Sequence, residues 1–579
     1  MIQKRTSVVA ILILFLANLL QAQDRPNVLL IVCDDLNDFV GHMGGHPQGY
    51  SPNIDALAES GASFVHAYSN NPICAPSRSS FLTGIYPHTS GNFAFAEWFE
   101  NEVLANSKTL MQYFSENSYQ VAGCGKTMHH HKADEWQEYG PKIGQGPVAW
   151  DGNGPVAMPS VPEPYRSVGL LDGSFGSLAQ VPFVGEAGKG WSLYAWKYEP
   201  FHYNSDEDRD LLPDERSAQW AVNRLTAHAQ QKAANPDADP LFLAVGFYKP
   251  HTPMVAPQKF FEMFPLESIQ LPTILANDNL DTHYKDIFPE STKGIKLFNA
   301  LKASYPTIEE GLAHFLQAYL ACVAFVDEQI GVVLDALDTN GLADDTIVIL
   351  TSDHGWNLGE KDYLFKNSPW EESDRVPFIV RAPGISHAGS RPVAPVSLID
   401  IYPTLVDLCG LTGDTRKNDM GKPLDGSSIR PLLENPQSSE WAGPDVALTM
   451  VKYTKDDRNP QPPEAITDAL YQHYSLRSEH FRYIRYNDGV EELYDHRNDP
   501  FEWNNLAGDA EHESVLREFR LRLGAFFKPN VSGAWMYTFD LDAFQLADFG
   551  DGWSWSLALD SLVYGANDEP GWLFVVNQG

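Results

Sequence analysis

The chain of 579 residues contains 41 Lys and Arg against 76 Asp and Glu, so its formal net charge at pH 7 is −35. This excess of negative charge argues against nucleic acid and against an anionic membrane surface as binding partners. Hydrophobic residues make up 43% of the chain and aromatic residues 12%. Such a chain can bury a large core, and we expect one big domain with a smaller one appended.

Residues 1–23 have the pattern of a secretory signal peptide. Basic residues precede an apolar run from Val8 to Leu20, and the small residue Ala22 follows it. The run is too short to span a bilayer, and no later stretch is apolar for long enough. No cysteine follows the run, so a lipid anchor is not expected. We therefore predict an exported protein, periplasmic or secreted, without a membrane anchor.

The first predicted strand, residues 26–33, is the continuous apolar run PNVLLIVC, which is typical of a buried parallel strand. Asp34 and Asp35 follow it directly. Open α/β sheets bind ligands at the carboxyl ends of their strands, so this pair is a candidate for ligand binding. The alternative is a solvated turn or a cap for the next helix.

Cys74 lies at the predicted N-terminus of a helix. In the sequence CAPSRSSFLTG, Pro76 suits the first turn of a helix and Gly84 suits its end. Amide groups and the helix dipole favour an anion beside the cysteine. Arg78 stands four residues on, one turn along the same face. The alternative is a buried helix start that carries an inert thiol.

A further predicted strand, residues 119–124, leads into GKTMHHH, which contains Lys126 and His129. A run of histidines is often a solvated patch or a chance metal site, and we assign no function to the two that follow His129. Residues 140–205 are rich in Gly, Pro and aromatic residues and show little periodicity. We expect this segment to be irregular and to shape the substrate pocket.

Two more apolar runs end in polar residues. Residues 241–247, LFLAVGF, lead towards His251, and residues 346–355, TIVILTSDHG, contain a strand that ends at Asp353 and His354. These residues also belong at the carboxyl edge of the predicted sheet. On its own, His251 would more simply be interpreted as a capping or core histidine.

Lys366 stands in LFKNSPWEE, between this strand and the next apolar run. Residues 308–339 form a long amphipathic helix whose apolar stripe we assign to the core. From about residue 440 short alternating strands predict a small antiparallel sheet, followed by a helix at 511–527. We thus predict a catalytic domain over 24–439 and a C-terminal subdomain over 440–579 that includes an unassigned tail, residues 530–579.

Five cysteines are few for an oxidising compartment. Apart from Cys74, they are Cys33, Cys124, Cys322 and Cys409, all in apolar surroundings typical of core thiols. We predict no essential disulfide framework.

The string C-x-P-S-R-x-x-x-L-T-G that begins at Cys74 resembles the signature of the type I sulfatases. In that family the cysteine is oxidised to Cα-formylglycine, and the hydrated aldehyde is the nucleophile. The resemblance implies an alkaline-phosphatase-like α/β fold, with a large mixed sheet flanked by helices and a smaller C-terminal antiparallel-sheet subdomain. It also implies a formylglycine-generating maturation enzyme as a partner.

The resemblance implies one divalent cation, with Ca²⁺ ahead of Mg²⁺, which would position the nucleophile and neutralise sulfate charge. Its ligands would be Asp34, Asp35, the modified Cys74, Asp353 and His354.

The remaining catalytic residues also follow from the resemblance. Arg78, Lys126 and Lys366 would add positive charge near the sulfate. His251 would protonate the leaving oxygen, and His129 would take the proton from the remaining hydroxyl so that sulfate is expelled.

Among sulfatases, the segments DDLND, GKTMH, KPHTPMVAP and TSDHGWNLGE most resemble the iduronate-2-sulfatases and their bacterial relatives. The resemblance implies a sulfated polysaccharide or oligosaccharide as substrate, with a 2-O-sulfated uronic acid as one candidate. Alternatives are a phosphonate or phosphate-ester hydrolase of the same superfamily and a catalytically silent glycan-binding homologue. An exported two-metal phosphatase would normally have Ser or Thr in place of Cys74.

Overall fold

The computed structural model describes residues 25–181, 188–288, 290, 292–453 and 468–527, together with short strands within 534–576. The predicted signal peptide lies outside the described residues, as does much of the tail beyond residue 527. Within these ranges, none of the helices combines the length and the apolar character that crossing a bilayer requires.

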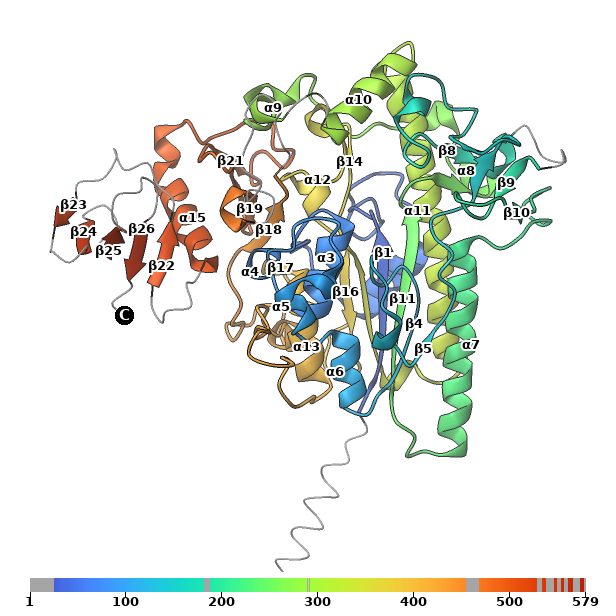
Figure 1. The fold of residues 1–579 in the computed structure, drawn as a ribbon, viewed down its shortest axis with the longest axis horizontal. Helices are drawn as coiled ribbons and strands as arrows, with labels where there is room; N and C mark the ends of the chain where they lie inside the picture. The colour runs from blue at the N-terminus through green and yellow to red at the C-terminus, as the bar shows by residue number, and fades with distance from the viewer. Residues whose placement is uncertain are drawn as a thin grey trace, which may run out of the picture.

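A seven-stranded mixed sheet forms the centre of the fold (Figure 1). From edge to edge its strands are β2 (Ala62–Ser63), β16 (Phe378–Arg381), β13 (Thr346–Ser352), β1 (Asn27–Asp34), β11 (Leu241–Pro250), β4 (Gln120–Gly125) and β5 (Glu138–Tyr139). The pairings from β13 through β1, β11 and β4 to β5 are parallel, whereas β16 pairs antiparallel with β13 and β2. The predicted large mixed sheet is confirmed.

Helices cover both faces of this sheet (Figure 1). They are α7 (Pro213–Ala234) and α11 (Ile308–Thr339) on one face, and α3 (Cys74–Thr83), α6 (Leu110–Glu116) and α13 (Ile401–Leu408) on the other. All eight residues of β1 are buried. Leu29 and Ile31 belong to the hydrophobic core under α7 and α11, and Leu30 and Val32 belong to the core on the opposite face of the sheet. A strand covered on both faces has no polar positions, which explains its unbroken apolar sequence.

Helix α3 begins at Cys74, as predicted, and all ten of its residues are buried. Gly84 ends the helix with a left-handed backbone, φ 71°, and its N–H donates to the carbonyl of Ser80 at 2.8 Å. A Cβ atom at this position would lie 2.4 Å from the Leu424 side chain. Backbone conformation and space therefore both require glycine, and Cys74 lies on a tightly packed element.

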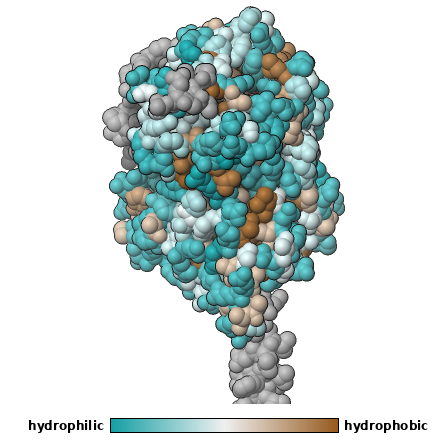
Figure 2. All heavy atoms as spheres, turned by 90° about the vertical axis from the view of Figure 1, so that its right-hand side faces the viewer, coloured by the Kyte–Doolittle hydropathy of each residue, from teal (hydrophilic) through white to brown (hydrophobic). Residues whose placement is uncertain are grey.

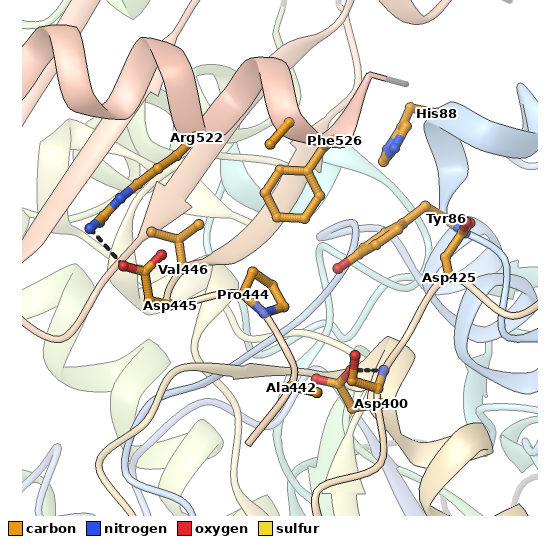
Figure 3. A pocket seen from close by; sticks show the side chains of 12 residues that line it. Tyr86, His88, Asp400, Asp425, Ala442, Pro444, Asp445, Val446, Arg522 and Phe526 are labelled. Carbon is orange, nitrogen blue, oxygen red and sulfur yellow. Dashed lines mark hydrogen bonds and ion pairs between the residues drawn. The ribbon is translucent and has the colours of Figure 1, made fainter. Parts of the chain in front are cut away.

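A four-stranded antiparallel sheet follows residue 440, as predicted. Its strands are β18 (Ala447–Val451), β19 (His473–Arg477), β20 (Phe481–Arg485) and β21 (Glu491–Asp495), and α15 (Glu513–Phe526) comes after them. The ring of Phe526 lies edge-on to Tyr86, just beyond the end of α3, at 6.0 Å. A cavity of about 380 Å³ opens between these elements (Figure 3), and none of the predicted site residues lines it.

Residues 140–205 contain a small sheet that the sequence does not predict. Its strands are β6 (Val148–Trp150), β7 (Pro155–Val156), β9 (Gly190–Ser192) and β10 (Pro200–Phe201). Strands of two or three residues are too short to show an alternating pattern. In the same segment β8 (Phe175–Ser177) pairs with β12 (Met254–Ala256), which follows His251 closely. The insertion is thus tied to the segment that carries His251.

Figure 2 shows the side of the molecule on which this insertion and α7 lie, and this face is mostly hydrophilic, with its hydrophobic side chains in small patches. All five cysteines are buried and free, which agrees with the predicted absence of a disulfide framework.

Candidate active site

Four parallel strands of the central sheet, β1, β4, β11 and β13, end at the same edge. At or directly after their ends stand Asp34 and Asp35, Lys126, His251, and Asp353 and His354. Two further segments reach the same place. Cys74 Sγ, at the start of α3, lies 3.0 Å from Lys366 Nζ, just after β15 (Leu364–Phe365), and 3.4 Å from His354 Nε2.

Positive charge surrounds the Cys74 thiol. Burial alone would raise its pKa, but the charges of Lys126, Lys366 and His354 outweigh burial and hold the pKa well below its usual range. The side chain of His129 adds a hydrogen bond to the thiol. In a desolvated site such charges are worth far more than in water. The position of Cys74 is therefore built to stabilise an anion.

Asp34 and Asp35 each pair with a lysine. Lys126 Nζ donates to Asp34, and Lys366 Nζ lies 2.6 Å from Asp35 Oδ1. Burial would raise the pKa of Asp34, but the charge of Lys126 keeps it below its usual range. Both carboxylates are fully buried, yet Asp34 Oδ1 and Asp35 Oδ2 accept no hydrogen bond. Two buried anionic oxygens thus remain free to bind a cation.

A divalent cation fits these residues. Asp34, Asp35, Cys74 and His354 each offer a ligand atom, and these four atoms lie within 4.8 Å of one another. Carboxylate oxygens suit hard divalent cations, whereas the imidazole also suits transition metals, so the donor set does not select one ion. The structure therefore contains a plausible metal site at the predicted place.

Asp353 lies slightly apart from these four ligand atoms. Its Oδ2 accepts from Arg78 Nε at 2.8 Å, and its Oδ1 accepts the backbone N–H groups of Asp35 at 3.2 Å and His354 at 3.0 Å. The same Oδ1 lies 3.6 Å from His354 Nε2. Asp353 therefore pairs with an arginine and orders the adjacent backbone, and its predicted role as a metal ligand stays a prediction.

Arg78 is completely buried and its guanidinium binds the ends of three strands. Besides Asp353 after β13, it donates to Cys33 O of β1 at 3.1 Å and to the carbonyls of Lys126 and Thr127 after β4. Asp34 Oδ1 lies 3.7 Å from its Nη2. The fork of Arg78 thus fixes the relative positions of the strand ends, in addition to supplying positive charge.

The two predicted catalytic histidines contact different members of the cluster, His251 beside Asp35 and His129 beside Cys74. His251 Nδ1 lies 2.5 Å from Thr252 O, and its Nε2 lies 3.9 Å from Asp35 Oδ2. Its side chain is 14% exposed, so the ring can be reached from solvent. Burial lowers the pKa of His129, which favours the neutral imidazole needed to accept a proton.

Some residues that order the site were not predicted. The hydroxyls of Ser69 and Ser77 both donate to Asp353 O at 2.6 Å. Buried Asp214 accepts the backbone N–H groups of Tyr248 at 2.8 Å and Lys249 at 2.9 Å, and so holds the segment before His251. Ser77 stands inside the cysteine motif and could have been noticed there, whereas nothing in the sequence distinguishes Asp214 from other acids at helix starts.

The fold and this cluster define an enzyme of the α/β class, with its reactive groups at the carboxyl edge of a mixed sheet. The family model for sulfatases matches residues 26–411, so the chain belongs to the sulfatase family and is a sulfuric ester hydrolase. A second model, for the C-terminal part of N-sulphoglucosamine sulphohydrolases, matches residues 359–528. The predicted kinship with type I sulfatases is confirmed.

Similar curated proteins agree with this family. A sulfatase of Formosa agariphila is 30% identical over 525 residues, which cover 88% of each chain. The iduronate 2-sulfatase of Mus musculus is 28% identical, with 86% of this chain and 94% of the relative covered.

Solved structures confirm the fold. The phosphonate monoester hydrolase of Agrobacterium radiobacter superposes with a TM-score of 0.60 at 23% identity, covering 87% of this chain and 95% of that one. A 2-O GAG sulfatase superposes with a TM-score of 0.59 at 21% identity, covering 87% and 92%.

Proposed function

We propose that the protein hydrolyses sulfate monoesters of a sulfated glycan, with a formylglycine made from Cys74 as nucleophile and one divalent cation, Ca²⁺ first, as cofactor. One observation carries this proposal: Cys74 Sγ lies at a helix N-terminus among Lys366 Nζ, His354 Nε2 and the Asp34–Asp35 pair. Maturation by a formylglycine-generating enzyme belongs to the proposal.

The residues of the chain divide the chemistry between them. Lys126 and Lys366 stabilise the negative charge of the sulfate and of the nucleophile. His251, whose ring is partly exposed, protonates the leaving oxygen, and His129 takes the proton from the remaining hydroxyl. Arg78 keeps the strand ends in register through its four contacts.

Asp34, Asp35, the modified residue 74 and His354 would hold the cation, with Asp353 beside them. The cation would neutralise sulfate charge and lower the pKa of the attacking hydroxyl. The two carboxylate oxygens without hydrogen-bond partners support this assignment.

The names of several relatives support a glycan as substrate. They include iduronate 2-sulfatases at 28% and 30% identity, an ulvan-active sulfatase of Formosa agariphila at 27% and an N-acetylglucosamine-6-O-sulfatase of Bacteroides thetaiotaomicron at 25%. A choline-sulfatase of Rhizobium meliloti at 25% is also similar, so the names alone do not fix the sugar. A 2-O-sulfated uronic acid remains our first candidate within this class.

The organisation and location of the chain remain part of the proposal. Residues 1–23 would be removed on export to the periplasm or the medium, residues 24–439 would form the catalytic domain, and residues 440–579 the C-terminal subdomain. The C-terminal family match and the antiparallel sheet β18 to β21 support the last assignment.

Two measurements test the proposed function. Protein co-expressed with a maturation enzyme should carry an aldehyde at residue 74 by peptide mass spectrometry, and Cys74→Ala should abolish aryl sulfate hydrolysis while the protein stays folded. An intact thiol together with full activity would overturn the mechanism. Faster turnover of an aryl phosphate than of an aryl sulfate would instead support the phosphonate and phosphate-ester alternative.

A further inference from the structure

Three positive or titratable side chains near the active site have no part in the chemistry above. His130 and His131 continue the chain beyond His129, and Lys142 begins the insertion. Backbone hydrogen bonds hold Lys142 close to β4. The N–H of Gly125 donates to the carbonyl of Pro141, the residue before Lys142, at 2.9 Å. Lys142 and Lys126 therefore leave the same end of β4 from neighbouring, hydrogen-bonded segments.

Lys142 carries an uncompensated charge. It is exposed, and among the described residues it forms no ion pair with a carboxylate. Partial burial lowers its pKa, so an anionic partner would stabilise its charged form. In a chain of net charge −35, a lysine beside the site that has no carboxylate partner among the described residues adds local positive charge there.

The positive charge of Lys142 acts on both His130 and His131. Burial lowers the pKa of each, and the charge of Lys142 lowers it further. Glu97 is the carboxylate that faces His130 and acts in the opposite direction. His131 Nδ1 is buried and has no hydrogen-bond partner. These two histidines, to which the sequence assigns no function, are therefore half-buried side chains next to a lysine without an ion-pair partner among the described residues.

Ring contacts of Phe95 and His129 connect this group to the active site. The Phe95 side chain is 54% exposed and its ring lies 5.1 Å from that of His129. The rings of His129 and His130 are 4.8 Å apart, and His129 hydrogen-bonds to Cys74. An exposed aromatic face next to imidazole donors, with a lysine near them, suits a sugar ring that carries an acidic substituent.

We propose that Lys142, with His130 and His131, binds a second acidic group of the substrate, a carboxylate or a further sulfate, while Phe95 packs against the sugar ring. This inference rests on the proposed function. Lys142, His130 and His131 then determine the specificity for polyanionic sugars, and they are separate from the residues that bind the sulfate to be cleaved.

The test compares a substrate that has one anionic group with two substrates that have a second one. Aryl sulfate carries one anion, and two sulfated disaccharides carry in addition either a carboxylate or another sulfate. For Lys142→Gln, the ratio of kcat/KM for a two-anion sugar to that for aryl sulfate should fall about fivefold, mainly through KM, as expected for a partly exposed ion pair. Lys142→Arg should restore the ratio.

A matched control is Lys197→Gln, because Lys197 lies in the same insertion but already pairs with Glu199 at 2.6 Å. It should leave the ratio unchanged. An unchanged ratio in Lys142→Gln, with both disaccharides, would overturn the inference, as would an equal loss in the lysine variant and the control. A change with only one disaccharide identifies the acid as carboxylate or sulfate.

Binding separates this inference from the proposed function. In the Cys74→Ala protein, calorimetry with the same disaccharides measures affinity without turnover, and Lys142→Gln should weaken Kd about fivefold in that background. If aryl sulfate is not hydrolysed by the mature protein, the proposed function fails, whereas the calorimetric difference still decides for or against the subsite.

Discussion

Lys366 Nζ lies 3.0 Å from Cys74 Sγ, and the same ammonium lies 2.6 Å from Asp35 Oδ1. Although Lys366 is far from both residues in the sequence, it is buried between them. Burial would lower its pKa, but the charges of Asp35 and Cys74 raise it well above its usual range. A permanently charged lysine thus joins the proposed nucleophile to a proposed metal ligand.

Lys366→Met should therefore lower kcat for aryl sulfate about 100-fold or more, since a preorganised charge next to the reacting group is lost. Steady-state kinetics on fully matured protein measures this, with mass spectrometry to confirm the aldehyde at residue 74. Lys197→Met, at an exposed ion pair, is the control and should keep kcat. A kcat within a factor of two of wild type would remove Lys366 from the catalytic group.

The contact between Arg78 and Asp353 predicts a large effect on stability. Both side chains are completely buried and Arg78 Nε lies 2.8 Å from Asp353 Oδ2. Arg78→Met would leave buried carboxylates without their partner, and the free energy of unfolding should fall by about 3–5 kcal/mol.

Urea unfolding measures this difference. Arg166→Met is the matched control, because Arg166 forms an exposed pair with Glu163 at 2.9 Å and should cost less than about 1 kcal/mol. Equal losses in the two variants would show that the buried fork has no special part in holding the strand ends.

How much of this site could be predicted depends on the kind of signal. The unbroken apolar runs before Asp34 and Asp353 revealed buried strands, and parallel strands must share one carboxyl edge. The long helix 308–339 was predicted with the same bounds that the structure shows, because its apolar spacing extends over many turns. The start of α3 at Cys74 followed from the motif.

Other features depend on contacts that spacing does not determine. The position of Arg78 one turn after Cys74 did not reveal that its guanidinium binds the carbonyls of Cys33 and Lys126. The strands of the insertion were too short to show periodicity. The charge of Lys142 acts on His131 and the ring of Phe95 contacts His129, and both come from other segments of the chain.

Calcium should stabilise the protein through the Asp34–Asp35 cluster. A cation that binds only the folded state raises the free energy of unfolding, by about 2.7 kcal/mol at 100 times Kd. Chelator-treated protein should therefore melt at a higher temperature when Ca²⁺ is restored, and Asp35→Asn should reduce the shift, as followed by calorimetry.

A second cluster of possible metal ligands, Glu371, His496 and Glu502, provides the control. Arg482 already pairs with both of its glutamates, so this cluster needs no cation. The calcium shift should persist in Glu502→Gln. If the calcium shift is lost in Glu502→Gln but retained in Asp35→Asn, the cation binds at the Glu371–Glu502 cluster instead of the Asp34–Asp35 cluster.

Buried neutral histidines should make the fold sensitive to acid. His473 is fully enclosed, its Nδ1 accepts the N–H of Asn487 at 3.2 Å, and burial lowers its pKa to about 3. The unfolded chain binds this proton near pH 6.5, so the contribution is complete above pH 6.5 and is lost as pH falls towards 3, by up to about 1.4 kcal/mol per pH unit. Urea unfolding between pH 7 and pH 4 should show a shallower loss of stability in His473→Gln than in the wild type. His202→Gln, at a 58% exposed side chain, should follow the wild-type slope. Identical slopes in all three proteins would mean that His473 binds its proton equally well in the folded and unfolded states.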